Sequence, residues 1–540
     1  MNRLLISAAH KSSGKTTLSI GLCAALARHQ LKVQPFKKGP DYIDPMWLSL
    51  ASGRPCHNLD FYLTPDEEIL ETFSGYSRDT DIALIEGNKG LYDGLDLDGS
   101  NSNAALAKLL AAPVILVIDA RGMTRGVAPL ILGYQAFDPE IRIAGVILNQ
   151  LGGARHERKL RAVIEHYTDV PVIGAVHHDD RLAIVERHLG LMPSNEASEA
   201  RAKIDVIAEA VTAQVDLDRL MAIAASAPLL SVPAVQKRTL SLSPLEREVA
   251  SDRTLTPSPL LEGEGSSKVA LSQASANAPD LALGPCSRQD STSAIHGVVP
   301  PASMQSSPAS GRGDLDNIPI KLGIARDAAF AFYYPADLDA LRRHGAELVP
   351  FDTLKDPHLP EVDALFIGGG FPEVHMQALE ANRSLRADIR QAIESGLPVY
   401  AECGGLMYLS RSLRWQGRQC EMVGAIPGDT VMHDRPHGRG YVKLRETGKS
   451  PWPRIAGAAL EIRAHEFHYS TLENIPGNLE YAYEVTRGTG IDGHHDGIVH
   501  RNVLACYTHM RDVGGNHWTG RFVEFVRRQR AVRRPALASI

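Results

Sequence analysis

The chain has 540 residues, of which 44% are hydrophobic, so it can bury more than one core and is expected to form two or three domains. Its 57 basic and 63 acidic residues give a formal net charge of −6, which offers no electrostatic case for nucleic acid as the partner. These properties favour a multidomain protein that acts on small molecules.

The N-terminus and the cysteines indicate a cytoplasmic protein. The stretch MNRLLISAAHKSSGKTT has an apolar run too short for a signal-peptide core or a membrane span. The six cysteines are scattered without a CxxC pair, so we expect neither a disulfide framework nor a zinc site. The sequence therefore predicts reduced thiols and no membrane partner.

Two series of apolar strands predict two α/β domains. Residues 1–235 alternate short β-branched runs with helical stretches, which is typical of a doubly wound parallel sheet. The runs are LLISA, KVQPF, IALIE, VILVIDA, IAGVILNQ and VPVIGAV. A second series begins at IKLGIAR and continues through AELVPFD, DALFIGGG and LPVYAECGG, which predicts another α/β domain over residues 318–530.

The segment between these domains, residues 236–317, is rich in Ser, Pro, Ala and Gly and lacks periodicity. Such a composition cannot bury enough apolar area to offset the entropy of ordering, so we predict a low-complexity, disordered linker. Within it, RTLSLSPL is echoed by RTLTPSPL. An inserted, non-catalytic segment is the preferred interpretation, and a regulatory or docking tail is the alternative.

A phosphate-binding loop is expected near the N-terminus. The sequence LLISAAHKSSGKTT places a buried-type strand and a loop before Gly14, Lys15, Thr16 and Thr17 at the start of a helix. Backbone amides and the helix N-terminus can hold phosphate there, while the lysine adds charge and the first threonine can offer its hydroxyl to Mg²⁺. A chance GKT in a solvated loop is the alternative.

Three nearby residues leave questions open. The pattern GxxxxGK[ST] expects glycine where this chain has Ala9, so the entry turn is expected to differ slightly. Lys11 is one place away from the extra lysine of partition-type ATPases, and we interpret it as a solvated loop residue. Asn149 follows an apolar strand and either reads a nucleotide base or caps a turn.

Acidic residues follow two further strands of the predicted sheet. Asp41 and Asp44 lie in KKGPDYIDP, and Glu86 directly follows IALI. Carboxylates at the ends of parallel strands can hold Mg²⁺ beside a nucleotide, although Asp near Pro is also ordinary turn chemistry. Lys37 and Lys38 either meet substrate carboxylates or are simply solvated.

The strongest signal is a candidate nucleophile. LPVYAECGGLMYL carries Cys403 from a strand through a glycine turn into a helix, where a thiolate is favoured. Backbone amides of Gly369 and Gly370, in the upstream FIGGGFPE, and of Gly404 are the predicted donors to an oxyanion. A buried structural cysteine and a plain glycine turn are the alternatives.

The thiol needs a base, and two histidine regions compete for that role. RAHEFHYS contains His465 and His468, whereas VLACYTHMRD contains His509 after an apolar strand-like run. Position alone favours His509 modestly over His468. Each of them can also be an ordinary packed or solvated histidine.

Taken together, these motifs resemble the cobyrinate (or hydrogenobyrinate) a,c-diamide synthase family, which joins a dethiobiotin-synthetase-like ATPase domain to a type I-like glutamine amidotransferase domain. The resemblance covers both predicted domains but not the linker. Its motifs are GKTT, KKGPDYIDP, IEGNKGLYDG, ERHLGLMP, ARDAAFAFYYP, FIGGGFPE, AECGGLMYL, AHEFHYS and NVLACYTH.

The resemblance implies roles for particular residues. Cys403 would be the glutaminase nucleophile, and His509 in NVLACYTH would raise its nucleophilicity. A type I triad carries glutamate two residues beyond the histidine, where this chain has Arg511, so the resemblance implies a dyad. It also implies that Thr16, Glu86 and one of the two aspartates in KKGPDYIDP surround Mg-ATP.

The chemistry implied by the resemblance is amidation of the a and c acetate side chains of a corrin, with ATP phosphorylating each carboxylate and ammonia from glutamine attacking it. The expected partners are ATP, glutamine and a corrin carboxylate, and the sequence leaves a homodimer open. One alternative is amidation of another tetrapyrrole, such as nickel sirohydrochlorin, or of other corrin side chains, as in cobyric acid synthase. An alternative of another class is a nucleotide-dependent, partition-type switch.

Overall fold

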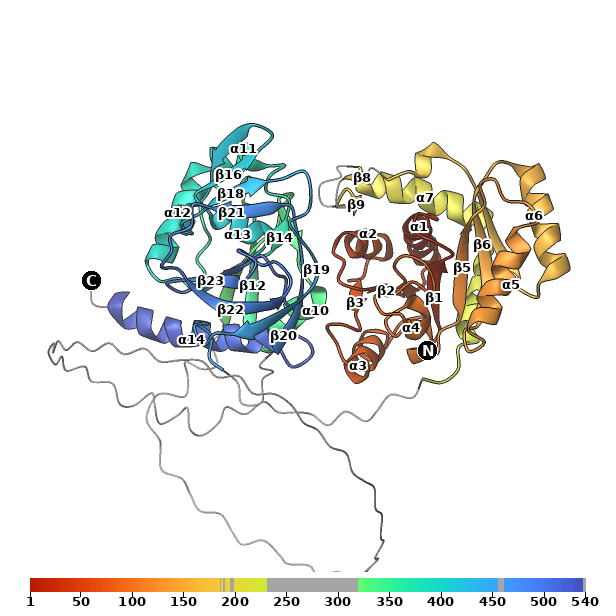
Figure 1. Ribbon diagram of the computed structural model, residues 1–540, viewed down its shortest axis with the longest axis horizontal. Coiled ribbons are helices and arrows are strands. Elements are labelled where there is room, and N and C mark those ends of the chain that lie inside the picture. Colours follow the sequence, from red (N-terminus) through yellow and green to blue (C-terminus); the bar gives the residue numbers. More distant parts are fainter. Residues whose placement is uncertain (185, 188–189, 195–198, 231–318, 455–460, 538–540) are drawn as a thin grey trace, which may run out of the picture. The chain divides into compact units, whose positions relative to one another are not determined.

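The computed structural model describes residues 1–184, 186–187, 190–194, 199–230, 319–454 and 461–537 (Figure 1). The predicted linker, residues 236–317, lies outside the described residues. No helix in the described ranges combines the length and the apolarity that are needed to cross a membrane.

The first region is built on a parallel sheet of seven strands, in the order β3-β2-β4-β1-β5-β6-β7 (Figure 1). Its elements are β1 (Arg3–Ala8), α1 (Lys15–Arg28), β2 (Val33–Lys38), α2 (Ile43–Ser52), β3 (His57–Leu59), α3 (Asp66–Tyr76), β4 (Ile82–Glu86), α4 (Asn103–Leu109), β5 (Val114–Asp119), α5 (Val127–Phe137), β6 (Ile143–Leu151), α6 (Ala154–Tyr167), β7 (Val172–His177), η1 (Asp180–Leu182), β8 (Glu186–Arg187), β9 (Gly190–Leu191), α7 (Ala200–Gln214) and α8 (Leu217–Ala225). The predicted doubly wound fold is confirmed.

Both faces of this sheet are covered, which explains the continuous apolar runs in its strands. Alternate side chains of β1 point to opposite faces, so Leu4 and Ile6 pack with α1, α2 and α7 while Leu5 packs with α3 to α6. All six residues of β1 are buried. The strand ends that carry the predicted phosphate and metal residues therefore sit on a rigid, fully packed base.

The second region holds a mixed sheet of nine strands, in the order β12-β10-β13-β15-β24-β23-β22-β19-β20. Its elements are β10 (Ile320–Ala325), β11 (Phe330–Phe332), α10 (Pro335–Arg343), β12 (Ala346–Phe351), β13 (Ala364–Ile367), β14 (Gly369–Gly370), α11 (Met376–Ala381), α12 (Arg383–Glu394), β15 (Val399–Glu402), α13 (Gly404–Leu409), β16 (Ser412–Trp415), β17 (Arg418–Glu421), β18 (Asp429–Met432), β19 (Gly438–Glu446), β20 (Glu461–His468), β21 (Ser470–Glu473), β22 (Glu480–Arg487), β23 (His495–His500), β24 (Val503–Cys506) and α14 (Trp518–Leu537).

The four strands expected from the sequence, β10, β12, β13 and β15, pair in parallel and are joined by β24. The other half of the sheet, β23, β22, β19 and β20, is antiparallel. Helices α11, α12 and α13 cover one face, and α10 and α14 cover the other. This confirms a second α/β domain and adds an antiparallel extension to it.

The two regions pack together within one compact unit. Phe332 and Phe371 of the second region belong to the buried apolar cluster that includes Ile6 and Ile43 of the first. Hydrogen bonds reinforce this contact, for example from Tyr441 Oη to Asp60 Oδ2 at 2.7 Å. The described residues of both regions can therefore line common cavities.

Candidate functional site

The GKTT loop joins β1 to α1 in the geometry of an anion-binding turn. Gly14 caps α1 in a left-handed conformation, with φ of 81°. A Cβ atom at this glycine would lie 2.1 Å from Asn149 Nδ2, so the asparagine packs directly on the loop. Asn149 Nδ2 donates to the carbonyl oxygen of Ser13 at 2.9 Å. The asparagine thus holds the phosphate loop, an outcome closer to the turn-capping alternative than to base recognition.

The departure from the glycine pattern at Ala9 does not disturb the turn. The backbone N–H of Ala9 donates to Val117 O at 3.0 Å, and its φ is not among the positive values of the described residues. The left-handed positions of the loop are Ser12, with φ of 66°, and Gly14. Alanine is therefore compatible with this position. Lys11 is exposed, as expected for a solvated lysine.

A buried charge cluster lies behind this loop. Thr16 Oγ1 donates to Glu86 Oε1 at 2.8 Å and to Asp44 Oδ2 at 3.3 Å. Lys37 Nζ donates to the same two oxygens, at 2.8 Å to Glu86, and its side chain is 2% exposed. Lys15 Nζ lies 3.7 Å from Glu86 Oε1. Lys37 is thus not solvated, because it neutralises the two carboxylates that face the phosphate loop.

The electrostatics favour the ionised Lys37–Asp44 pair. Burial lowers the pKa of Lys37 when taken alone, but Asp44 and Glu86 raise it well above its ordinary value. Burial likewise opposes ionisation of Asp44, yet Lys37 holds the pKa of that carboxyl below its usual range. These two charges therefore stabilise one another, as a buried ion pair requires, whereas burial lowers the pKa of Lys15.

The remaining predicted residues of this site are placed differently. Asp41 Oδ1 accepts from the backbone N–H groups of Ile43 (2.9 Å) and Asp44 (3.2 Å) at the start of α2. Its Oδ2 lies 3.8 Å from Lys37 Nζ. Thr17 is half-buried in the first turn of α1. Of the two aspartates, Asp44 is the one brought to Thr16.

These residues fit a bound Mg²⁺ that shares its ligands with nucleotide phosphates. In the described ranges, no group of three or more His, Cys, Asp or Glu side chains is arranged to hold a metal alone. Mg²⁺ commonly uses only one or two carboxylates together with phosphate oxygens and water. Glu86 Oε2 is buried and accepts no hydrogen bond from the described residues, which leaves it as a spare ligand oxygen.

The candidate nucleophile lies on a strained turn. Cys403 joins β15 to α13 with φ of 47° and ψ of −100°, and only 7% of the residue is exposed. Its backbone N–H donates to Cys506 O at 2.7 Å, which fixes the turn to the neighbouring strand β24. A non-glycine residue in such a conformation persists only where the surroundings impose it, as at nucleophile elbows.

The predicted oxyanion glycines lie around this turn. A Cβ atom at Gly404 would lie 3.0 Å from the amide nitrogen of Gly370, so these two backbones are adjacent. A Cβ atom at Gly370 would lie 1.9 Å from Ala329 O, and one at Gly369 would lie 2.6 Å from His509 Cε1. The structure therefore brings Gly370 and Gly404 together and packs Gly369 against a histidine ring.

His509 is the histidine that meets the thiol. Its side chain hydrogen-bonds to Cys403, and burial notwithstanding, this bond and Glu402 raise the pKa of His509 to about 10. The ring of His465 stacks on it with centroids 5.0 Å apart. His468 instead stacks on Tyr507 and shares a hydrogen bond with Ser470 O at 2.8 Å. Of the three candidate histidines, His509 is the one whose side chain hydrogen-bonds to Cys403.

Glu402, which was not predicted as a site residue, faces the His509 ring nitrogen Nδ1. Glu402 Oε2 lies 3.3 Å from His509 Nδ1. Its Oε1 accepts from Tyr400 Oη at 2.5 Å and from the backbone N–H of Met510 at 3.0 Å. The carboxylate that the sequence lacks at Arg511 is thus supplied by the residue before the nucleophile. A glutamate ending the otherwise apolar strand VYAE was the signal available.

A cavity of about 280 Å³, here called the transfer cavity, is lined by residues of both regions. Its lining includes Cys403 and His509 from the second region and Lys38, Asp41 and Asn88 from the first. The ring of Tyr42, which also lines it, lies 5.2 Å from the ring of His509. The nucleophile therefore faces the same cavity as Asp41, whose Oδ2 lies 3.8 Å from Lys37 Nζ of the charge cluster.

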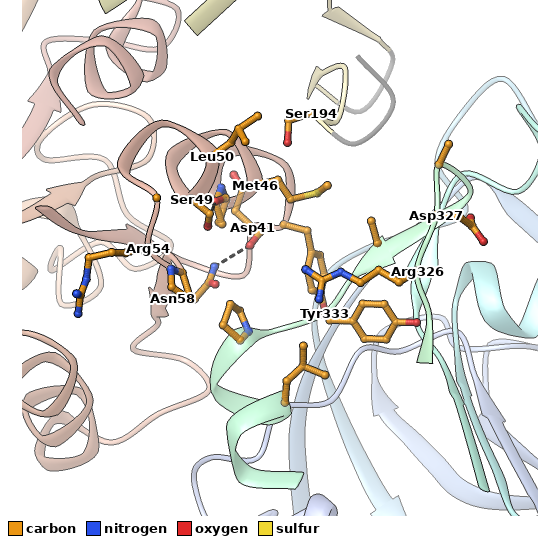
Figure 2. Close-up of a pocket in the computed structure, with 18 of the residues that line it drawn as sticks. Asp41, Met46, Ser49, Leu50, Arg54, Asn58, Ser194, Arg326, Asp327 and Tyr333 are labelled. Atoms are coloured by element: carbon orange, nitrogen blue, oxygen red, sulfur yellow. Dashed lines mark hydrogen bonds between the residues drawn. The ribbon is translucent and has the colours of Figure 1, made fainter. Parts of the chain in front are cut away.

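A larger pocket of about 850 Å³ also has Asp41 and Tyr42 in its lining (Figure 2). Figure 2 shows Asn58 beside Asp41, whose backbone carbonyl accepts from Asn58 Nδ2 at 2.7 Å. Neither Cys403 nor His509 lines this pocket. This pocket is larger than the transfer cavity, but it does not include the thiol or the histidine beside it.

Comparisons with known proteins agree with the two halves of the site. Residues 5–191 match the family described as the CobQ/CobB/MinD/ParA nucleotide binding domain. Residues 321–513 match the CobB/CobQ-like glutamine amidotransferase domain. A protein of Magnetococcus marinus named cobyrinate a,c-diamide synthase is 41% identical over 99% of both chains.

The chain belongs to the cobyrinate a,c-diamide synthase family. Two archaeal proteins of the same name, from Methanosarcina acetivorans and Archaeoglobus fulgidus, are 38% and 36% identical. The former match covers 99% of this chain and 97% of the relative, and the latter covers 97% of each. Because the nucleotide-binding description also includes MinD and ParA, the amidotransferase domain and these long matches distinguish the family from partition-type switches.

Proposed function

We propose that the chain amidates the a and c carboxylates of cobyrinate or hydrogenobyrinate, consuming ATP and glutamine for each amide, in cobalamin biosynthesis. The observation that carries this proposal is the transfer cavity, which Cys403 and His509 line together with Lys38, Asp41 and Asn88. The names of the full-length relatives supply the acceptor. A nucleophile without an ammonia acceptor would make only a glutaminase, and the shared cavity argues for transfer.

In the glutaminase half, the Cys403 thiolate attacks the carboxamide carbon of glutamine. The resulting oxyanion is stabilised by the backbone amides of Gly370 and Gly404, with Gly369 supporting the histidine ring. His509 donates its proton to the departing nitrogen, so ammonia leaves and a thioester remains. The neutral imidazole then takes a proton from the water that hydrolyses the thioester to glutamate.

Glu402 acts on this reaction as a positioning residue. Its carboxylate faces His509 Nδ1, so it fixes the ring's orientation and leaves Nε2 for the thiol. It also stabilises the protonated ring that forms beside the thiolate. The type I arrangement of nucleophile, base and acid is thereby kept with the acid on a different strand.

In the synthetase half, a carboxylate oxygen of the acceptor attacks the γ-phosphorus of ATP, releasing ADP and forming an acyl phosphate. The amides from Gly14 to Thr17 and the Lys15 ammonium hold the phosphates. Thr16, Asp44 and Glu86 would hold Mg²⁺, with Asp41 at the edge of this site. When bound, Mg²⁺ neutralises phosphate charge. Ammonia then attacks the acyl carbon, and inorganic phosphate leaves.

The cavity supports direct transfer between the halves. Ammonia that crosses this short distance as the neutral molecule stays nucleophilic, whereas in bulk water near neutral pH it would be protonated and lose its lone pair. Tyr42 and His465 both line the transfer cavity and also contact the His509 ring, so the base and the cavity share walls. Binding of Mg²⁺, formation of a homodimer and a cytoplasmic location stay predictions from the sequence.

The test is incubation of the purified chain with ATP, glutamine and each macrocycle in turn, followed by product mass. Conversion of cobyrinate or hydrogenobyrinate to a diamide supports the proposal. Exclusive turnover of nickel sirohydrochlorin would favour the alternative acceptor. ATP hydrolysis that depends on DNA or membrane and ignores glutamine and corrinoids would favour a switch.

A further inference from the structure

A second cavity adjoins the transfer cavity. It has a volume of about 740 Å³ and shares with the transfer cavity the lining residues Lys38, Pro40, Asn88, His465 and Phe467. We call it the basic cavity because four cationic side chains line it, namely Lys38, Lys89, Arg439 and Arg487. An acceptor held here would lie beside the source of ammonia.

These four cations are available to a ligand. Within the described ranges, none of them forms an ion pair with a carboxylate. The other two basic side chains of β19 do so: Lys443 pairs with Glu461 at 3.0 Å and Arg445 with Glu484 at 3.2 Å. The Arg439 guanidinium lies 5.3 Å from the ring centre of Phe467, and that of Arg487 lies 5.5 Å from the ring centre of Tyr62. The arginines therefore rest on aromatic faces with their donors free for an anion.

The carboxylates in the lining are engaged by their own surroundings. Asp60 accepts from Tyr441 Oη and from two backbone N–H groups. Glu466, which is 2% exposed, accepts from the N–H groups of Thr489 (2.7 Å) and Gly490 (2.8 Å). Asp93 accepts from the backbone N–H of Gly90 at 2.9 Å. The acids thus shape the cavity walls, while the cations retain unused donors.

We propose that the basic cavity binds the acceptor as a polycarboxylate macrocycle, with its peripheral carboxylates on Arg439, Arg487 and Lys89. This proposal rests on the proposed function. Guanidinium groups pair with carboxylates bidentately, and an ammonium adds a further positive charge for the same ligand.

Lys38 marks the reacting end of this cavity, because it also lines the transfer cavity together with Cys403 and His509. It is 7% exposed, and its ammonium donates to Asn88 Oδ1 at 3.5 Å. Burial lowers the pKa of Lys38 to about 8, and a carboxylate bound beside it would raise that pKa again. A carboxylate on Lys38 would therefore stand next to the ammonia source.

The larger pocket of Figure 2 is a weaker candidate, since several of its cations are already satisfied. Arg54 Nε donates to Gln34 Oε1 at 3.1 Å. Arg342 pairs with Asp339 at 2.8 Å, and Lys355 pairs with Asp352 at 3.3 Å. It shares only Asp41 and Tyr42 with the transfer cavity.

The experiment compares Arg439→Gln and Arg487→Gln with Arg445→Gln, a matched control on β19 whose surface ion pair lies outside the cavity. Cobyrinate binding is measured by calorimetry, and KM values for cobyrinate and ATP are measured in the coupled reaction. Each cavity variant should weaken cobyrinate binding roughly tenfold to hundredfold, the range for losing a charge-assisted hydrogen bond. In the cavity variants, the KM for ATP and the glutaminase activity without acceptor should equal those of the wild type. Arg445→Gln should keep the wild-type cobyrinate affinity as well.

The outcomes separate this proposal from the one on which it rests. If the wild type binds and amidates cobyrinate while both cavity variants match Arg445→Gln, the basic cavity is not the acceptor site. If the wild type neither binds nor amidates any corrin, the proposed function fails instead. Should one arginine variant misfold, Lys89→Gln provides a third arm, and its unchanged cobyrinate affinity would count against the cavity.

Discussion

Replacing Glu402 by glutamine should separate the chemistry of the thiol from the fold that carries it. The change keeps the shape of the side chain and removes the charge that lies 3.3 Å from His509 Nδ1. The bonds from Tyr400 Oη and Met510 N to the other oxygen can persist with an amide carbonyl. The variant is therefore expected to fold and to differ mainly in the protonation of His509.

The size of the effect follows from the surroundings of the ring. Burial alone would lower the pKa of His509, and the bonds to Cys403 and Glu402 together raise it to about 10. Loss of a close opposite charge should lower that pKa by roughly one to two units, which corresponds to about 1.4–2.7 kcal/mol of lost stabilisation of the imidazolium. The His509 imidazolium that accompanies the thiolate then loses its proton at a lower pH than in the wild type.

The assay is the pH profile of glutaminase kcat/KM. Its basic limb should move to lower pH in Glu402→Gln, because the reaction needs the protonated His509. Because the folded pKa of His509 exceeds its unfolded value, protonation stabilises the fold fully below about pH 6.5, and this contribution fades as pH rises toward 10. In Glu402→Gln, in which the folded pKa of His509 is expected to be lower, this stabilisation should be lost over a narrower pH range.

A matched control is Glu446→Gln, which removes a buried carboxylate that pairs with Arg521 at 2.6 Å and lies outside the lining of the transfer cavity. This control should lower thermal stability without moving the pH profile of glutaminase kcat/KM. An unchanged profile in a folded Glu402→Gln, or an equal shift in the control, would refute the positioning role of Glu402.

Three further substitutions probe the two halves separately. Cys403→Ala should abolish glutamine-driven amidation and spare amidation driven by added ammonia, measured by product mass; loss of both would contradict the division of labour. Gly370→Ala places a Cβ atom 1.9 Å from Ala329 O, which must displace the Gly370 amide. Glutaminase kcat should therefore fall by roughly 10²–10³-fold, while ammonia-driven turnover is retained. A normal kcat would argue against this amide as an oxyanion donor. Lys37→Met leaves buried carboxylates unpaired, so we expect denaturation to show a loss of about 3–5 kcal/mol of stability. Phosphate release should show a loss of ATP-dependent turnover. Wild-type stability would show that other groups compensate the charge of these carboxylates.

Much of the parallel framework could be predicted, because fully buried parallel strands appear as unbroken apolar runs. IALIE and VILVIDA, for example, became β4 and β5 at the centre of the first sheet. The antiparallel strands β19, β20 and β22 were not predicted. One of their faces is exposed, so residues such as Arg445 and Glu461 interrupt the apolar pattern.

For the candidate site too, some features could be predicted from the sequence and others could not. Local sequence was sufficient for the turn at Cys403, since the glycines that a strained elbow requires are its neighbours in the chain. Contacts distant in sequence were not accessible: Lys37 and Glu86 meet only because β2 and β4 are adjacent strands. Glu402 was overlooked because the acid was sought after the histidine, whereas pairing of β15 with β24 brings the two residues together.

The most direct test of the account supplies glutamine with an isotopically labelled amide nitrogen to the wild-type chain, together with ATP and cobyrinate, in the presence of unlabelled ammonium. The account predicts a corrin a,c-diamide in which both new amides carry the label, because ammonia passes from Cys403 through the transfer cavity without mixing with solvent. A diamide that carries mainly unlabelled nitrogen would contradict enclosed transfer, and the absence of any amidated corrin would contradict the function itself.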